Sequence, residues 1–118
     1  MDQLKFGIVG AAGRPTAFLE AFRSSGKAVL AAACDLNAEA LEQALKDLPG
    51  VERYADYEEM LDRAGLDAVI VGTPMPLHVS QSIAALQRGI HVYSEVTAAV
   101  SVEECRALLK ACRESKAQ

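Results

Sequence analysis

The chain has 118 residues, of which 51% are hydrophobic and 24% are charged, and this composition is typical of a single ordinary globular domain. Its net charge is −4, its basic residues form no run and it contains no Trp, so we expect no nucleic-acid-binding surface. The longest apolar run, Ala28–Cys34, is far below the roughly 20 residues of a membrane-spanning helix, and the N-terminus resembles no signal peptide.

Continuous apolar runs alternate with helix-period runs along the chain, which predicts βαβ units and a parallel sheet. The predicted strands are Leu4–Val9, Ala28–Cys34, Val51–Tyr54 (the weakest), Asp67–Val71 and Ile90–Ser94. The predicted helices are Pro15–Ser24, Ala38–Leu48, Tyr57–Ala64, Pro76–Arg88 and Val102–Ser115. With strands numbered in chain order, these elements predict an α/β three-layer doubly wound Rossmann fold of order 3-2-1-4-5. A ligand is then expected outside the carboxyl ends of strands 1 and 4.

The turn after the first strand departs from the G-x-G-x-x-G pattern of dinucleotide-binding turns. Gly10 allows the sharp bend, whereas Ala12 and Pro15 stand at the second and third glycine positions. Proline suits a first helical turn but removes one N–H donor to phosphate. An ordinary βα loop with small residues is the alternative interpretation. The predicted cofactor-binding residues of this turn are Gly10, Ala11, Ala12, Gly13, Arg14 (which would add positive charge) and Pro15.

An acidic residue follows the second strand at the place where a dinucleotide's ribose is bound. This residue is Asp35, and Leu36 comes directly after it. A carboxylate accepts hydrogen bonds from ribose hydroxyls and repels a 2′-phosphate, which favours NAD over NADP. A solvent-exposed aspartate at a strand end is the alternative.

Two later segments place polar residues at the same edge of the predicted sheet. Thr73 and Pro74 end the fourth strand, and His78 lies in the first turn of the next helix. Glu95 follows the fifth strand. A single histidine is more often structural than catalytic, but this position leaves both interpretations of His78 open. We expect His91, within the fifth strand, to be structural.

The cysteines are odd in number and show neither C-x-x-C spacing nor a histidine at ligand spacing. We interpret Cys34, Cys105 and Cys112 as small buried thiols in a reducing cytoplasm. Cys105 and Cys112 stand in line with Val102 and Leu109, which suits a core-facing helix stripe. No metal site is predicted.

Taken together, five segments resemble the N-terminal domain of the glucose–fructose oxidoreductase / inositol dehydrogenase / MocA (Gfo/Idh/MocA) family over nearly the whole chain. They read KFGIVGAAG, CDLN, YADYEEML, DAVIVGTPMPLH and GIHVYSEVTAAVS. The resemblance implies a nicotinamide-dependent dehydrogenase domain that acts, with a second domain, on sugars, polyols or related hydroxy compounds. It also implies that the turn and Asp35 hold the adenosine half of the cofactor. Thr73, Pro74 and His78 would lie along the nicotinamide side.

The family's E-K-P motif corresponds to Glu95, Val96 and Thr97. Val96 cannot bind or transfer a proton as the lysine does, and Thr97 stands where a proline, often cis, fixes the loop. Relatives in this family continue into a sixth strand and a substrate domain. We therefore expect NAD binding, with Glu95 and Val96 beside the cofactor, and no catalysis by this chain alone.

The alternative is a stand-alone, non-enzymatic or degenerate nucleotide-binding module. We also expect self-association into a homo-oligomer. Its contacts would be the edge of the fifth strand, with the apolar residues Ile90 and Val92, or the last helix around Val102–Cys112.

Overall fold

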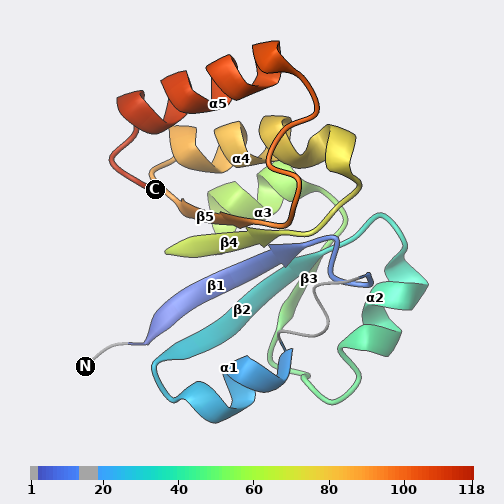
Figure 1. Ribbon diagram of the computed structural model, residues 1–118. Helices are drawn as coiled ribbons and strands as arrows, with labels where there is room; N and C mark the ends of the chain where they lie inside the picture. The colour runs from blue at the N-terminus through green and yellow to red at the C-terminus, as the bar shows by residue number, and fades with distance from the viewer. Residues whose placement is uncertain (1–2, 14–18) are drawn as a thin grey trace.

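Five parallel strands form the centre of the molecule, in the order β3-β2-β1-β4-β5 (Figure 1). The computed structural model describes residues 3–13 and 19–118. The predicted order is confirmed, with boundaries that differ by no more than one residue. The strands are β1 Leu4–Val9, β2 Ala28–Cys34, β3 Glu52–Tyr54, β4 Ala68–Val71 and β5 His91–Ser94.

The helices follow the predicted pattern, and most of their described boundaries lie within two residues of the prediction. The predicted start of the first helix, Pro15, lies outside the described residues. The predicted second helix ends at Ala44 rather than Leu48, because a turn in which the Leu48 N–H donates to the Leu45 carbonyl replaces its last residues. The fourth helix begins with a separate 3₁₀ turn. The helices are α1 Leu19–Ser25, α2 Ala38–Ala44, α3 Tyr57–Arg63, η2 Met75–Leu77, α4 His78–Gln87 and α5 Val102–Glu114. In the described residues, none of them combines the length and the apolar character needed to cross a bilayer.

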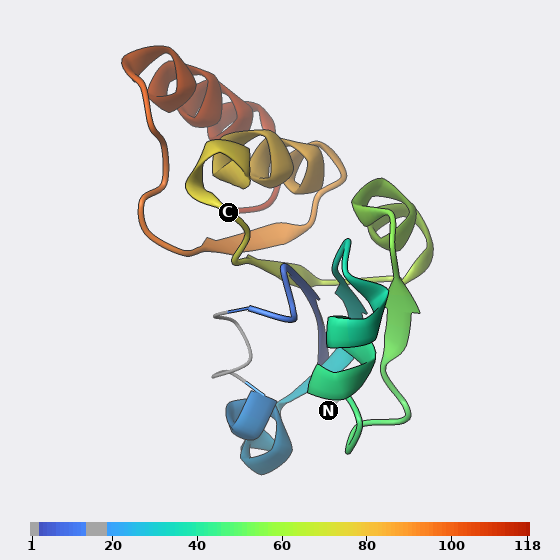
Figure 2. The same ribbon diagram turned by 90° about the vertical axis from the view of Figure 1, so that its right-hand side faces the viewer.

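Helices cover both faces of the sheet (Figure 2). The sheet therefore separates the core into two clusters, one on each face. Val69 and Val71 of β4 face α3 and α4, where Met60 is fully buried. Ile70, between them, faces the opposite side and packs with Leu41 of α2. This alternation follows from the period of two along a strand, and it buries β4 on both faces.

Side chains cap three of the helices as their sequences predict. Asn37 accepts a hydrogen bond from the Ala40 N–H, and Asp56 accepts one from the Glu59 N–H. At the start of α5, the Ser101 hydroxyl accepts the Glu104 N–H, while the Glu104 carboxylate accepts the Val100 N–H. These bonds satisfy amides that have no partner inside the helix.

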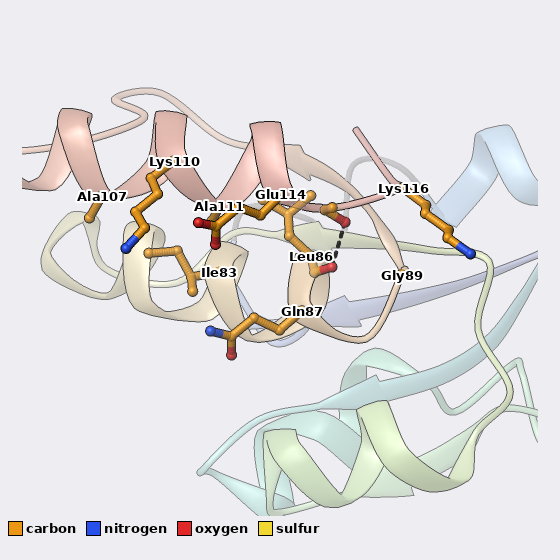
Figure 3. Close-up of a pocket in the computed structure, with 10 residues that line it drawn as sticks. Ile83, Leu86, Gln87, Gly89, Ala107, Lys110, Ala111, Glu114 and Lys116 are labelled. Atoms are coloured by element: carbon orange, nitrogen blue, oxygen red, sulfur yellow. Dashed lines mark hydrogen bonds between the residues drawn. The ribbon is translucent and has the colours of Figure 1, made fainter.

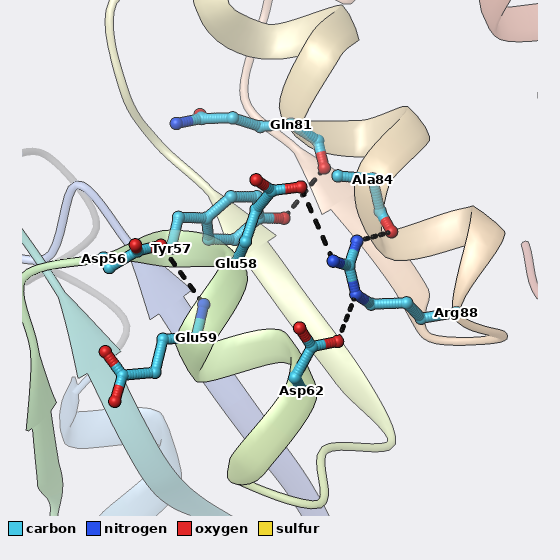
Figure 4. A network of polar contacts seen from close by, with 8 residues as sticks. All are labelled: Asp56, Tyr57, Glu58, Glu59, Asp62, Gln81, Ala84 and Arg88. Carbon is cyan, nitrogen blue, oxygen red and sulfur yellow. Dashed lines mark hydrogen bonds and ion pairs between the residues drawn. The ribbon is translucent and has the colours of Figure 1, made fainter.

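A polar network joins α3 to α4 (Figure 4). The Arg88 guanidinium donates to the Asp62 carboxylate at 2.7 Å and to the Ala84 carbonyl at 2.9 Å. The hydrogen bond from Arg88 lowers the pKa of Asp62. Toward the other end of the pair, the Tyr57 hydroxyl donates to the Gln81 carbonyl at 2.8 Å. The two helices are therefore held together at both ends, and one of these contacts borders the site described below.

The sequence pattern predicts that the side of α5 that carries Cys105 and Cys112 faces the core, but α5 packs on α4 through another side. Leu108 and Ala111 are partly buried, whereas Cys105 and Cys112 are exposed. The prediction of buried thiols is therefore wrong for these two residues and right for Cys34. Seven-residue spacing places two side chains on one side of a helix, but it does not say which side faces the core. The exposed residues form the α5 stripe, which consists of Val102, Cys105, Leu109 and Cys112.

The free edge of β5 is less open than the sequence predicts. Ile90 precedes the strand and is buried, which contradicts its predicted place on an exposed edge. The Val92 N–H donates to the carbonyl of Gln118 at 2.7 Å, and the Gln118 N–H donates to Nδ1 of His91 at 3.0 Å. The end of the chain therefore occupies part of this edge.

Candidate functional site

A cavity of about 250 Å³ opens at the carboxyl ends of β1, β2 and β4. This is the edge at which an open α/β sheet changes direction and at which its ligands bind. Most of the lining is apolar, with a few polar groups among it, as in small-molecule sites generally. The lining residues are Val9, Gly10, Cys34, Asp35, Leu36, Ala55, Tyr57, Thr73, Pro74, Leu77 and Gln81.

Gly10 brings the turn after β1 close to the end of β4. Its φ of +80° lies in the region that only glycine adopts readily. A Cβ atom at this position would lie 2.8 Å from the carbonyl oxygen of Gly72. Any other residue would push the two loops apart and deform the cavity.

The carboxylate of Asp35 is fixed by two backbone amides. Its Oδ2 accepts the Ala12 N–H at 3.1 Å, and its Oδ1 accepts the Asn37 N–H at 2.9 Å. A carboxylate has about four lone-pair positions, so acceptor capacity remains on both oxygens. The aspartate is therefore oriented in advance and can still accept hydrogen bonds from a ligand's hydroxyl groups.

The described amides of the turn are bonded within the protein. Those of Gly10 and Ala11 donate to the Cys34 carbonyl at 2.9 and 3.2 Å, and that of Gly13 donates to the Gly10 carbonyl at 3.0 Å. Ala11 is buried in the core rather than in the cavity wall. The predicted residues Arg14 and Pro15 lie outside the described residues. Among residues 10–13, no amide is left over for a phosphate group.

Large apolar side chains border the cavity from two loops on opposite sides of β1. Leu36 comes from the loop after β2 and is 91% exposed, which is unusual for a leucine. Pro74 and Leu77 come from the loop after β4, and Leu77 is also exposed. Since β1 lies between β2 and β4, these side chains form two apolar walls with a slot between them. Such a slot suits a flat, apolar-faced ring.

Two polar contacts hold Gln81 in the lining of the slot. The Thr73 hydroxyl donates to the side-chain carbonyl of Gln81 at 2.5 Å, and Tyr57 holds the Gln81 backbone carbonyl. Burial raises the pKa of Tyr57, and burial together with the charges of Asp35 and Asp56 raises that of Cys34 to about 11. Both groups are therefore neutral at pH 7.

His78 is buried and ties two loops together. Its Nε2 lies 2.7 Å from the carbonyl oxygen of Thr73, and its Nδ1 lies 2.7 Å from that of Thr97. The ring therefore joins the loop after β4 to the loop after β5, and His78 is not among the residues that line the cavity. These two contacts support a structural role for His78.

Glu95 and Val96 lie in the loop after β5, outside the cavity lining. The Glu95 N–H donates to the Val71 carbonyl at 2.9 Å, which continues the pairing of β4 with β5. Val96 is 77% exposed, and the peptide bond between Val96 and Thr97 is cis. This loop offers no side-chain proton donor at position 96.

Comparison with known proteins agrees with this geometry. A family profile described as "Oxidoreductase family, NAD-binding Rossmann fold" matches residues 4–118, nearly the whole chain. The chain belongs to the Gfo/Idh/MocA oxidoreductase family. The predicted resemblance is therefore confirmed.

Solved structures and curated relatives place the chain within longer members of this family. The WlbA dehydrogenase from Bordetella pertussis, in complex with NADH and UDP-GlcNAcA, is 34% identical with a TM-score of 0.90 over 98% of this chain and 34% of that protein. The myo-inositol 2-dehydrogenase from Lactobacillus plantarum is 26% identical with a TM-score of 0.85, over 97% of this chain and 34% of its own. A glycosyl hydrolase family 109 protein from Shewanella baltica is 31% identical over 89% of this chain and 25% of its own. The chain thus spans about a quarter to a third of these relatives.

The structure brings together only part of the predicted site of this family member. Gly10, Asp35, Leu36, Thr73 and Pro74 line the cavity, and Ala12 is bonded to Asp35. The lining residues that sequence reasoning missed are Val9, Cys34, Ala55, Tyr57, Leu77 and Gln81. Most of them directly flank predicted segments at strand ends. Gln81 follows His78 by about one helical turn, so helix periodicity was the signal that could have found it.

A larger cavity of about 530 Å³ lies between α4 and α5 (Figure 3). Lys110 and Lys116 lie toward opposite ends of this groove and do not converge on a common point. Ser115 closes one side by donating its hydroxyl to the Leu86 carbonyl. In the described part of the chain, no three His, Cys, Asp or Glu side chains are grouped so that they could hold a metal ion. The cavity at the strand ends is therefore the better candidate site.

Proposed function

We propose that this chain is the NAD(H)-binding domain of an oxidoreductase that acts on a sugar, a polyol or a related hydroxy compound. The observation that carries the proposal is the position of Asp35, an oriented carboxylate at the mouth of an apolar slot at the switch point of the sheet. The WlbA structure is described as a complex with NADH and a nucleotide sugar. A scyllo-inositol dehydrogenase from Lactobacillus casei is described with bound NAD(H) and scyllo-inositol.

The slot fits the adenosine half of the dinucleotide. Adenine has flat apolar faces, which would pack between Leu36 on one side and Pro74 with Leu77 on the other. Pro74 would then lie beside the adenine rather than on the nicotinamide side that the family resemblance implies. The adjoining ribose would then donate its hydroxyls to Asp35. Because a 2′-phosphate would meet the carboxylate charge, we propose a preference for NAD over NADP. The nicotinamide group supplies the hydride chemistry when it is bound.

The loop after β5 is evidence for cofactor binding without substrate oxidation by this chain alone. Val96 is exposed and cannot donate or accept a proton, and His78 uses both ring nitrogens on backbone carbonyls. General acid–base chemistry needs a titratable side chain within reach of the reacting oxygen. We therefore propose that the chain holds and orients the cofactor but does not oxidise a substrate by itself.

Titration calorimetry with NADH and NADPH tests this function. We expect NADH to bind with a submillimolar Kd and NADPH to bind at least about tenfold more weakly, since a tenfold difference needs only about 1.4 kcal/mol. Asp35→Ser should reduce the difference between the two cofactors. Equal affinity for NADH and NADPH would overturn the NAD preference, and a Kd above millimolar for both would overturn the function.

Self-association is a second proposal, favoured by the exposed α5 stripe. Val102 and Leu109 are both at least half exposed on a surface flanked by Arg106 and Arg113, and apolar groups on a helix surface commonly mark a contact with another molecule. We propose that two copies pack through this stripe. Light scattering at high concentration should give a mass above one chain, and Leu109→Lys should return the mass to one chain. A wild-type mass of one chain at every concentration would contradict the proposal.

A further inference from the structure

We propose that Gln81 recognises the base of the bound dinucleotide, with its side-chain NH₂ group donating a hydrogen bond to a ring nitrogen of adenine. This specificity role rests on the proposed binding of NAD(H) in the slot at the strand ends. It adds a recognition contact on α4 to the ribose contact of Asp35.

The orientation of the Gln81 side chain is fixed by Thr73. An alcohol O–H can donate only to the oxygen of an amide, and the Thr73 hydroxyl lies 2.5 Å from Oε1 of Gln81. This contact turns the Nε2 atom, with two N–H donors, away from Thr73. Among the residues that the structure describes, Nε2 has no protein acceptor.

The backbone of Gln81 is fixed as well. The Tyr57 hydroxyl donates to its carbonyl at 2.8 Å and joins α3 to this turn of α4 (Figure 4). In the same view the Gln81 side chain extends away from the Arg88 network, with its amide group at the far end. Gln81 is therefore held at both its backbone and its side chain, and it lines the slot.

The other polar side chains of the slot are accounted for. The Thr73 and Tyr57 hydroxyls donate to Gln81 itself, and Asp35 is an acceptor. Cys34 is a neutral thiol at pH 7, because its pKa is raised to about 11, and a thiol is a weak donor. Among the side chains of the described lining, Gln81 thus presents the strong donor that remains.

Adenine supplies the matching chemistry. Its ring nitrogens are acceptors that lose water when the base enters an apolar slot, and a buried acceptor without a donor is costly. Leu36, Pro74 and Leu77 can contact the faces of the base but cannot satisfy its edge. The Gln81 amide can do so.

Substitution of Gln81 tests the inference, with ADP-ribose and NADH as probes in titration calorimetry. Gln81→Leu keeps the approximate size and removes the donor, so we expect Kd for both probes to rise about three- to tenfold. Gln81→Glu places acceptors against the ring nitrogens, and we expect a rise of more than tenfold. The matched control is Gln87→Leu on the same helix, which lies in the other cavity and should leave both Kd values unchanged.

Base analogues test the same contact without changing the protein. We compare ADP with 1-deaza-ADP, 3-deaza-ADP and 7-deaza-ADP, each of which lacks one ring-nitrogen acceptor. One of them should bind the wild-type chain about three- to tenfold more weakly than ADP and should lose nothing further in Gln81→Leu. This measurement holds even where a variant folds poorly.

A double-mutant cycle separates recognition from simple packing. Thr73→Val releases the amide orientation, so it should weaken ADP-ribose binding in the wild-type background and have less effect in the Gln81→Leu background. Wild-type affinity for ADP-ribose in Gln81→Leu, or unchanged binding of all three deaza analogues, would overturn the role of Gln81 while leaving the proposed function standing. Failure of the wild-type chain to bind NADH or ADP-ribose would overturn both.

Discussion

Oδ2 of Asp35 accepts the N–H of Ala12 at 3.1 Å, so the acidic residue that ends β2 holds the turn that follows β1. The same carboxylate accepts the Asn37 N–H at the start of α2. One side chain thereby links the turn after β1 to the loop after β2, and it still has lone pairs for ribose hydroxyls. Its orientation is set before any ligand arrives, which reduces the ordering that binding requires.

Replacing Asp35 with Ala should therefore affect both binding and stability. We expect the Kd for NADH to rise at least about tenfold, because charge-assisted hydrogen bonds contribute about 1.5–3 kcal/mol. Calorimetry and urea unfolding measure the two effects. Asp47→Ala removes the same charge from an exposed position after α2 and should change neither. Equal Kd values for the two variants would contradict the ribose role.

The bridging of two loops by His78 predicts a large effect on stability. His78→Ala leaves the Thr73 and Thr97 carbonyls without the ring and opens a space beside α4. We expect the free energy of unfolding to fall by about 2–4 kcal/mol. His91→Ala is the control, because His91 is exposed, and it should cost less than about 1 kcal/mol. Urea denaturation distinguishes them, and similar losses would argue against the bridge.

The contact from Tyr57 to Gln81 predicts a smaller effect. Tyr57→Phe keeps the ring and removes the hydroxyl that joins α3 to α4, so we expect a loss of about 0.5–1.5 kcal/mol. Tyr54→Phe removes a hydroxyl that donates to the exposed carboxylate of Glu52 and should be nearly neutral. Thermal unfolding of the two variants checks the difference. Tyr57→Phe as stable as wild type would show that the contact contributes nothing.

The three thiols should differ in reactivity toward maleimide at neutral pH. Cys105 and Cys112 are exposed on α5, whereas Cys34 is buried and its raised pKa keeps it protonated. Mass spectrometry of the native protein should show two adducts, and a third should appear in urea. Rapid labelling of Cys34 in the native protein would contradict its burial at the end of β2.

Cys34 also predicts a dependence of stability on alkaline pH. Its thiol keeps its proton up to a pH of about 11 in the folded chain, whereas its ordinary pKa is 9.0. Between these values the unfolded chain releases the proton and the folded chain does not, so rising pH lowers the free energy of unfolding. Urea unfolding from pH 8 to 10.5 should show a steeper fall for the wild type than for Cys34→Ala. Identical slopes would contradict this assignment.

The fold follows from local patterns in the sequence. The apolar run of β4 is buried throughout, and those of β1 and β2 are buried toward their carboxyl ends. Such runs are typical of a parallel sheet covered on both faces, and they need no tertiary information to be recognised. The caps Asn37, Asp56 and Ser101 are likewise local, because each side chain bonds an amide only three positions away. Gly10 and Asp35 were found for the same reason, since a sharp turn and a strand end are local features.

Which side chains meet depends on how the helices and strands pack together. Gln81 and Tyr57 reach the slot because α3 and α4 pack side by side, a relationship between residues far apart in the sequence. The sequence likewise does not determine which side of α5 faces the core, and in the structure Cys105 and Cys112 are exposed. Periodicity gives a helix two distinct sides, but the choice of the buried side depends on the neighbour that covers it.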